Sequence, residues 1–162
     1  MGNTIIEKII KHNTGAAQVK PGDIVTVNVD RVMIHDIFIP FVADKFEEMG
    51  FKKLWDPDRV VLIYDHLVPA SQLDDTRHFR VGDAFAARYG MKNVHRSDGI
   101  CHQLMTEAGY VKPGDVVFGT DSHTTTYGCV GAFSSGIGYT EMASILGTGT
   151  MWIKVPETIK VV

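Results

Sequence analysis

Short apolar runs alternate along this chain with segments of helical periodicity. Two of the runs, Val60 to Tyr64 and Val116 to Phe118, are continuous, which is typical of strands that are buried on both faces. Such strands need helices on either side, and the amphipathic segments between the runs can supply them. The pattern therefore predicts an α/β chain with a mostly parallel sheet flanked by helices. Helices are predicted over residues 4–12, 38–49, 74–89, 99–109 and 139–146, and strands over 24–29, 60–64, 93–95, 116–118 and 151–155.

The size and charge of the chain exclude several classes of protein. The chain has 162 residues, about one domain, and a net charge of −3, so no basic surface points to nucleic acid. No apolar run approaches the roughly 20 residues that span a bilayer, and the N-terminal segment lacks the apolar core of a secretory signal. The two cysteines, Cys101 and Cys129, do not make a disulfide framework. We therefore expect a cytoplasmic protein that binds neither nucleic acid nor membrane.

The stretch from residue 116 to residue 138 has the pattern of a site. Its apolar run stops at Gly119, and Asp121, Ser122 and His123 follow, before a threonine- and glycine-rich tail. A strand that opens into polar side chains can direct them into a crevice. A competing interpretation is a turn whose hydroxyl groups cap the next helix.

Three further polar clusters lie at the ends of predicted elements: His35 with Asp36, Asp65 with His66, and His102. The carboxyl ends of parallel strands share one edge of a sheet, so the clusters that follow the two buried runs are expected to converge. A carboxylate can orient an imidazole and raise its pKa, so that the ring donates a proton near neutral pH. Each Asp–His pair also has a simpler interpretation, as a cap or a surface pair.

The order and spacing of three motifs carry a family resemblance. Asp65-His66, then Gly-Ile-Cys-His-Gln at residues 99–103, then Gly-Thr-Asp-Ser-His-Thr at residues 119–124 with its glycine-rich tail, resemble the aconitase superfamily. The match is closer to the large subunits of 3-isopropylmalate dehydratases and their homoaconitase-like relatives. The resemblance implies an aconitase-like N-terminal domain and a hydro-lyase that removes water from a hydroxy di- or tricarboxylic acid such as 3-isopropylmalate, as in leucine biosynthesis.

The resemblance also implies roles for individual residues. His66, paired with Asp65, would protonate the leaving hydroxyl, and His102 with Asp121 would form a second pair beside an iron-bound water. The implied catalytic set is Asp65, His66, His102, Asp121 and His123, and the implied substrate-binding residues are His35 and Ser122.

Family members of this kind use a [4Fe-4S] cluster, whose three cysteine ligands lie further along their chains. Cys101 and Cys129 do not match those positions, so no metal ligand is assigned in this sequence. The resemblance therefore implies that residues 1–162 are the N-terminal portion of a longer large subunit that is truncated here. We expect this chain to contain no second domain and to have no activity alone. Its partners would be the remainder of that subunit and a small swivel-domain subunit.

Two other functions stay open at this point. A mononuclear metal-dependent hydrolase could hold zinc or iron through the side chains of the catalytic set given above. The chain could also be a non-catalytic assembly module, because the cluster cysteines are not in it.

Overall fold

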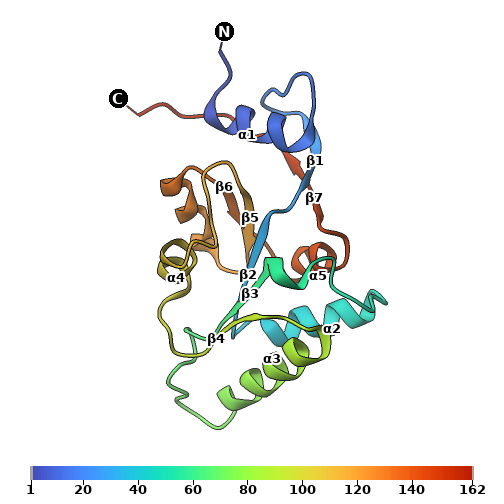
Figure 1. Cartoon of the computed structure of the whole chain (residues 1–162), viewed down its shortest axis with the longest axis vertical. Coiled ribbons are helices and arrows are strands. Elements are labelled where there is room, and N and C mark those ends of the chain that lie inside the picture. The colour runs from blue at the N-terminus through green and yellow to red at the C-terminus, as the bar shows by residue number, and fades with distance from the viewer. Residues whose placement is uncertain (1, 162) are drawn as a thin grey trace.

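A five-stranded parallel sheet forms the centre of the computed structural model, which describes residues 2–161. Met1 and Val162, the two ends of the predicted 1–162 domain, lie outside the described residues. The strands are β2 (Arg31–His35), β3 (Val60–Ile63), β4 (Asn93–His95), β5 (Val116–Gly119) and β6 (Phe133–Gly136). Their order is β4-β3-β2-β5-β6, so β2 is the central strand (Figure 1). This confirms the predicted α/β class.

Helices cover both faces of the sheet (Figure 1). On β5, Val116 and Phe118 belong to one buried cluster and Val117 to another, because alternate residues of a strand point to opposite faces. The first cluster includes Phe46 and Phe85, and the second includes Met105. The covering elements are α2 (Ile39–Glu48), α3 (Asp75–Tyr89) and α5 (Tyr139–Thr148) on the first face, and α4 (Cys101–Glu107) and η2 (Ser122–Val130) on the second. Burial on both faces is the reason why the strand runs are continuously apolar.

Two predicted strands do not join this sheet. β1 (Ile24–Asn28) and β7 (Thr150–Lys154) pair with each other, antiparallel, beside α1 (Ile5–Thr14). In β1 only Val27 is buried, so the strand alternates and can cover a core on one face only. α1 begins with a capping box, in which Thr4 and Glu7 satisfy each other's backbone N–H groups. The short 3₁₀ helix η1 (Pro57–Arg59) leads into β3.

The five predicted helices are all present, each within two residues of its predicted bounds, but two strands were not predicted. Residues 30–36 were assigned no element, yet they contain the central strand β2. The glycine-rich tail described above includes residues 133–136, which form the edge strand β6. The sequence Phe-Ser-Ser-Gly has weak intrinsic strand preference, and pairing with β5 decides its structure. Within residues 2–161, no helix combines the length and the apolar character that crossing a membrane requires.

Candidate active site

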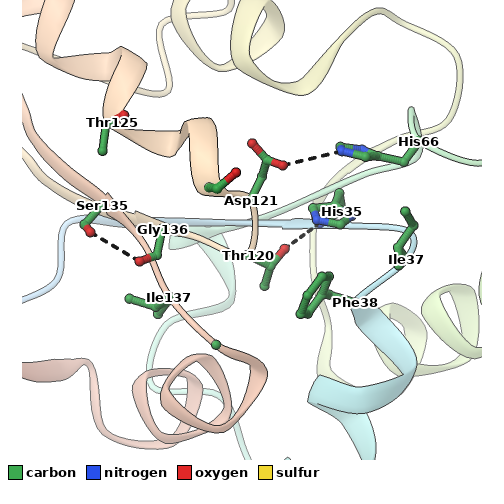
Figure 2. Close-up of a pocket in the computed structure, with 12 residues that line it drawn as sticks. His35, Ile37, Phe38, His66, Thr120, Asp121, Thr125, Ser135, Gly136 and Ile137 are labelled. Atoms are coloured by element: carbon green, nitrogen blue, oxygen red, sulfur yellow. Dashed lines mark hydrogen bonds and ion pairs between the residues drawn. The ribbon is translucent and has the colours of Figure 1, made fainter.

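Three neighbouring strand ends build the candidate site. β2 ends at His35, β3 leads into Asp65 and His66, and β5 leads into Thr120 and Asp121. Because β2 pairs in parallel with both β3 and β5, these ends meet at one edge of the sheet. They border a cavity of about 600 Å³ (Figure 2). Its lining residues are His35, Ile37, Phe38, His66, Thr120, Asp121, Ser122, Thr125, Ser135, Gly136, Ile137 and Gly138.

Asp65 orients the ring of His66. The Nδ1–H of His66 donates to Oδ1 of Asp65 over 2.6 Å, and the backbone N–H of Cys101 donates to Oδ2 over 2.7 Å. Burial raises the pKa of Asp65, but the hydrogen bonds from Cys101 and His66 outweigh it and leave that pKa lowered. Asp65 is therefore ionised, and it fixes the proton of His66 on Nδ1.

The other ring nitrogen of His66 faces Asp121 along the border of the cavity (Figure 2). His66 Nε2 lies 3.6 Å from Oδ2 of Asp121, and the side chain is 30% exposed. Burial lowers the pKa of His66, but the hydrogen bond to Asp65 and the charges of the nearby carboxylates outweigh it, so the pKa is raised. His66 can therefore carry a proton near neutral pH and offer it at Nε2.

Asp121 accepts hydrogen bonds from a second histidine and from the backbone. The Nε2–H of His102, on α4, donates to Oδ1 over 2.7 Å, and the backbone N–H of His123 donates to the same oxygen over 2.7 Å. Burial raises the pKa of Asp121, but these two hydrogen bonds outweigh it and lower the pKa to about 2. Asp121 is thus a carboxylate shared by three imidazoles, those of His66, His102 and His123.

Tyr127 extends this network and was not singled out from the sequence. It is fully buried, and its hydroxyl lies 3.1 Å from Nδ1 of His102. Burial raises the pKa of Tyr127, so the hydroxyl keeps its proton while it lies within hydrogen-bond distance of that nitrogen. No sequence pattern indicated this residue, because a tyrosine in a threonine- and glycine-rich segment carries no signal of its partner.

His35 lies beneath His66 in a different electrostatic state. Its side chain is 2% exposed, and its ring stacks on that of His66 with centroids 4.0 Å apart and planes 18° from parallel. Burial, and then the positive charge on His66, lower the pKa of His35 to about 4. Nδ1 of His35 has no hydrogen-bond partner among the described residues. Its backbone N–H donates to the hydroxyl of Thr120 over 3.2 Å.

Ser122 and His123, the two remaining predicted residues, differ in their position relative to the cavity. Ser122 lines the cavity, as does His35, and the substrate-binding role of both residues stays a prediction. His123 does not line it, and its side chain is 77% exposed, with Nδ1 lying 3.1 Å from Oδ1 of Asp121. The structure thus brings Asp65, His66, His102 and Asp121 into one chain of contacts and holds His123 at its outer end. Their catalytic roles stay predictions.

Three groups of residues could each offer donor atoms to a metal ion, and within each group these atoms lie within 4.8 Å of one another. The groups are His35, His66 and Asp121; Asp65, His66 and Cys101; and His102, Asp121 and His123. Imidazole lone pairs lie in the ring plane, so the stacked rings of the first group do not aim at one ion. Burial raises the pKa of the Cys101 thiol and keeps it protonated, while Cys129 is exposed and belongs to none of the groups. Two cysteines placed in this way do not fit as ligands of an iron–sulfur cluster.

The parallel sheet and the paired imidazoles and carboxylates at its edge define an α/β protein with an acid/base site. A model of the aconitase family (aconitate hydratase) matches residues 7–162, and the chain belongs to that family. It is similar to 3-isopropylmalate dehydratase large subunit 1 of Methanopyrus kandleri, with 42% identity over 99% of this chain. A probable 3-isopropylmalate dehydratase large subunit of Methanosarcina mazei is 44% identical over 97% of the chain. The chain spans 38% of the length of each of these relatives.

Proposed function

We propose that this chain supplies the acid/base half of a hydro-lyase site that acts on a hydroxy di- or tricarboxylic acid such as 3-isopropylmalate. The main support for the proposal is that two Asp–His pairs face each other at one cavity. Asp65 holds His66, Asp121 holds His102, and Nε2 of His66 lies 3.6 Å from Asp121. The names of the relatives support this reaction class. By the same reasoning, residues 1–162 form the N-terminal portion of an aconitase-like α/β domain.

The chemistry of dehydration explains these residue types. Hydroxide is a poor leaving group, and protonation of its oxygen lowers the barrier to its departure. His66 is placed for that step, because its Nδ1 is held by Asp65 and its Nε2 faces the cavity. The cavity, at about 600 Å³, has the size of a small-molecule site. Ser122 is proposed to donate a hydrogen bond to a substrate carboxylate.

Other partners are needed for a complete site. The residues that line the cavity include no lysine or arginine, although the proposed substrate carries two or three carboxylates. We attribute the missing cations to the remainder of the large subunit and to a small subunit. The [4Fe-4S] cluster that the resemblance implies is attributed to the complete dehydratase, because Cys101 and Cys129 do not provide its ligands.

A dehydratase assay tests this function. The chain is reconstituted anaerobically with iron and sulfide, alone and together with a candidate C-terminal segment and small subunit, and the alkene product is followed by ultraviolet absorbance. Activity is expected in the mixture and not in the chain alone. His66→Gln should lower kcat by about 100-fold or more, since general acid catalysis contributes on that scale.

The control is His12→Gln, because His12 is exposed and does not line the cavity. Equal loss in both variants, or full activity of His66→Gln, would contradict the assignment of His66. Activity in the chain alone, with one stoichiometric metal ion and no sulfide, would favour the mononuclear hydrolase. The group of His102, Asp121 and His123 is the one that suits that alternative. A folded mixture without activity would favour the assembly module.

A further inference from the structure

Asp36 is a buried carboxylate at the carboxyl end of β2. It is 0% exposed, and its two oxygens accept backbone hydrogen bonds from three residues. Oδ1 accepts from Ile37 over 3.1 Å and from His66 over 3.2 Å, while Oδ2 accepts from Leu67 over 2.8 Å. Burial of a polar side chain costs free energy unless its atoms are hydrogen-bonded, so the loss of these three hydrogen bonds would be unfavourable.

The hydrogen bonds join two separate segments of the chain. Ile37 follows β2, whereas His66 and Leu67 follow β3, about 30 residues later in the sequence. Two consecutive residues donate to different oxygens of one carboxylate, which fixes both the position and the direction of the backbone at His66. The carbonyl oxygen of Asp36 also lies 3.1 Å from Nδ1 of His78, so α3 holds the same residue from outside.

The backbone at His66 decides where its ring lies. From that backbone the ring reaches Asp65 at 2.6 Å and Asp121 at 3.6 Å, and it stacks on His35 at 4.0 Å. Each of these contacts depends on a backbone position that the side chain cannot adjust by itself. Asp36 makes no contact with the cavity, because it is absent from the lining residues. Its Oδ1 lies 3.9 Å from Nδ1 of His35 and 4.0 Å from Nδ1 of His66, so it acts on the site through its neighbours and, by its backbone hydrogen bonds, through the position of His66.

We propose that Asp36 is the positioning residue of His66: its carboxylate clamps the backbone after β3 so that the His66 ring is held between His35, Asp65 and Asp121. The expected effect of Asp36 on catalysis rests on the proposed function, whereas its effect on the position of His66 does not. An aspartate is required because both oxygens accept hydrogen bonds, whereas asparagine keeps one acceptor and presents an N–H₂ group to a backbone N–H.

The test compares Asp36→Asn with Asp30→Asn. Asp30 is a matched control, because its carboxylate also accepts a backbone hydrogen bond, from the N–H of Val116 over 2.9 Å. Asp30 immediately precedes β2, at the end of the strand away from the site. Amide hydrogen exchange and backbone chemical shifts are measured by NMR on the 162-residue chain. In Asp36→Asn the amides of His66 and Leu67 should exchange about 10-fold faster or more, and the ring signals of His35 and His66 should lose their stacking shifts. In Asp30→Asn these signals should keep their wild-type values.

A purely structural role predicts that the two variants change the signals of His66 and Leu67 alike, and that result would overturn the proposal. If Asp36→Asn does not fold, through-hydrogen-bond scalar couplings in the wild-type chain decide. Couplings from the amides of His66 and Leu67 to the Asp36 carboxylate carbon support the clamp, and their absence overturns it.

The catalytic consequence is measured in the reconstituted dehydratase mixture. Asp36→Asn should lower kcat by about 10- to 100-fold with KM changed less than about threefold, because a small displacement of a catalytic group costs rate more than binding. Equal kcat values for Asp36→Asn and Asp30→Asn would overturn the positioning role. A wild-type mixture without activity would count against the proposed function alone, since the NMR comparison still decides whether Asp36 places His66.

Discussion

His35 and His66 stack face to face, yet their pKa values are shifted in opposite directions. The difference arises from surroundings, because His66 is 30% exposed and bonded to Asp65, whereas His35 is 2% exposed and its Nδ1 has no partner among residues 2–161. Two adjacent imidazolium rings would also repel each other. The stack therefore separates a proton-bearing ring that borders the cavity from a neutral ring beneath it.

Because His35 is neutral in the folded chain, we predict that the free energy of unfolding depends on pH. Its pKa falls from 6.5 to about 4 on folding, so between these pH values the unfolded chain binds a proton that the folded chain does not. The contribution of His35 to the free energy of unfolding should be complete above pH 6.5 and should fall by on the order of 3 kcal/mol as the pH drops to about 4. The raised pKa of His66 acts in the opposite direction and adds stability as the pH falls, so the loss due to His35 is the difference between the wild type and His35→Gln. Urea unfolding at a series of pH values measures this loss.

His35→Gln provides the comparison, because glutamine does not titrate. The variant should show a much shallower loss over the same range. Asp65 and Asp121, whose pKa values are lowered, contribute at more acidic pH, as they gain protons in the unfolded chain below about pH 4. An equally steep loss in His35→Gln would show that another group is responsible.

At the scale of elements, β6 and η2 approach each other very closely beside Asp121. A Cβ atom on Gly136 would lie 2.5 Å from the carbonyl oxygen of Asp121 and 3.0 Å from Cα of Ser122. Both are backbone atoms, which cannot move aside as a flexible side chain could. Glycine at this position therefore sets the distance between the edge strand and the site loop.

Gly136→Ala should destabilise the fold by roughly 1–3 kcal/mol, as overpacking does, and should displace Asp121 from His102. Urea unfolding measures the first effect, and NMR of the His102 ring measures the second. Gly128→Ala is the matched control, since a Cβ there meets nothing within 4 Å. If the two variants have the same stability and the same His102 signals, the close approach has no role in holding Asp121.

Two of the strand ends that build the site, those of β3 and β5, could be predicted from the sequence. The strands β2 and β6 could not. β3 and β5 carry continuous apolar runs that end in Asp65-His66 and in Asp121, so their convergence at one sheet edge followed from parallel pairing. β2 could not be predicted because its three apolar residues, Val32 to Ile34, stand between the polar Arg31 and His35, and only burial in the centre of the sheet reveals it. β6 was missed because serine and glycine favour strands weakly.

Asp36 and Tyr127, which contact site residues, also could not be predicted from the sequence. Asp36 acts through backbone N–H groups that follow another strand, and Tyr127 acts through one nitrogen of His102. Contacts of this kind depend on tertiary structure and leave no periodic or spaced pattern in the sequence. The pair His35-Asp36 at the end of an element was the only signal, and it pointed to the histidine.

At the scale of the whole molecule, the central strand connects the site to the core. β2 contributes Val32 and Ile34 to the larger buried cluster and Met33 to the smaller one, so both faces of the sheet hold it. The larger cluster also includes Val27 of β1 and Ile153 of β7, which ties the antiparallel pair to the sheet. The site residues thus stand at one edge of a sheet that is packed on both sides, a common support for a catalytic centre.

The topology of the sheet brings His66 and Asp121 together, and this proximity should be visible in the titration of His66. Ring-nitrogen NMR of the 162-residue chain is recorded against pH for the wild type and for Asp121→Asn. The pKa of His66 should lie above its ordinary value in the wild type, and it should fall in the variant, because a negative charge 3.6 Å from Nε2 is removed. A His66 that titrates at its ordinary pKa, unmoved by Asp121→Asn, would contradict the account.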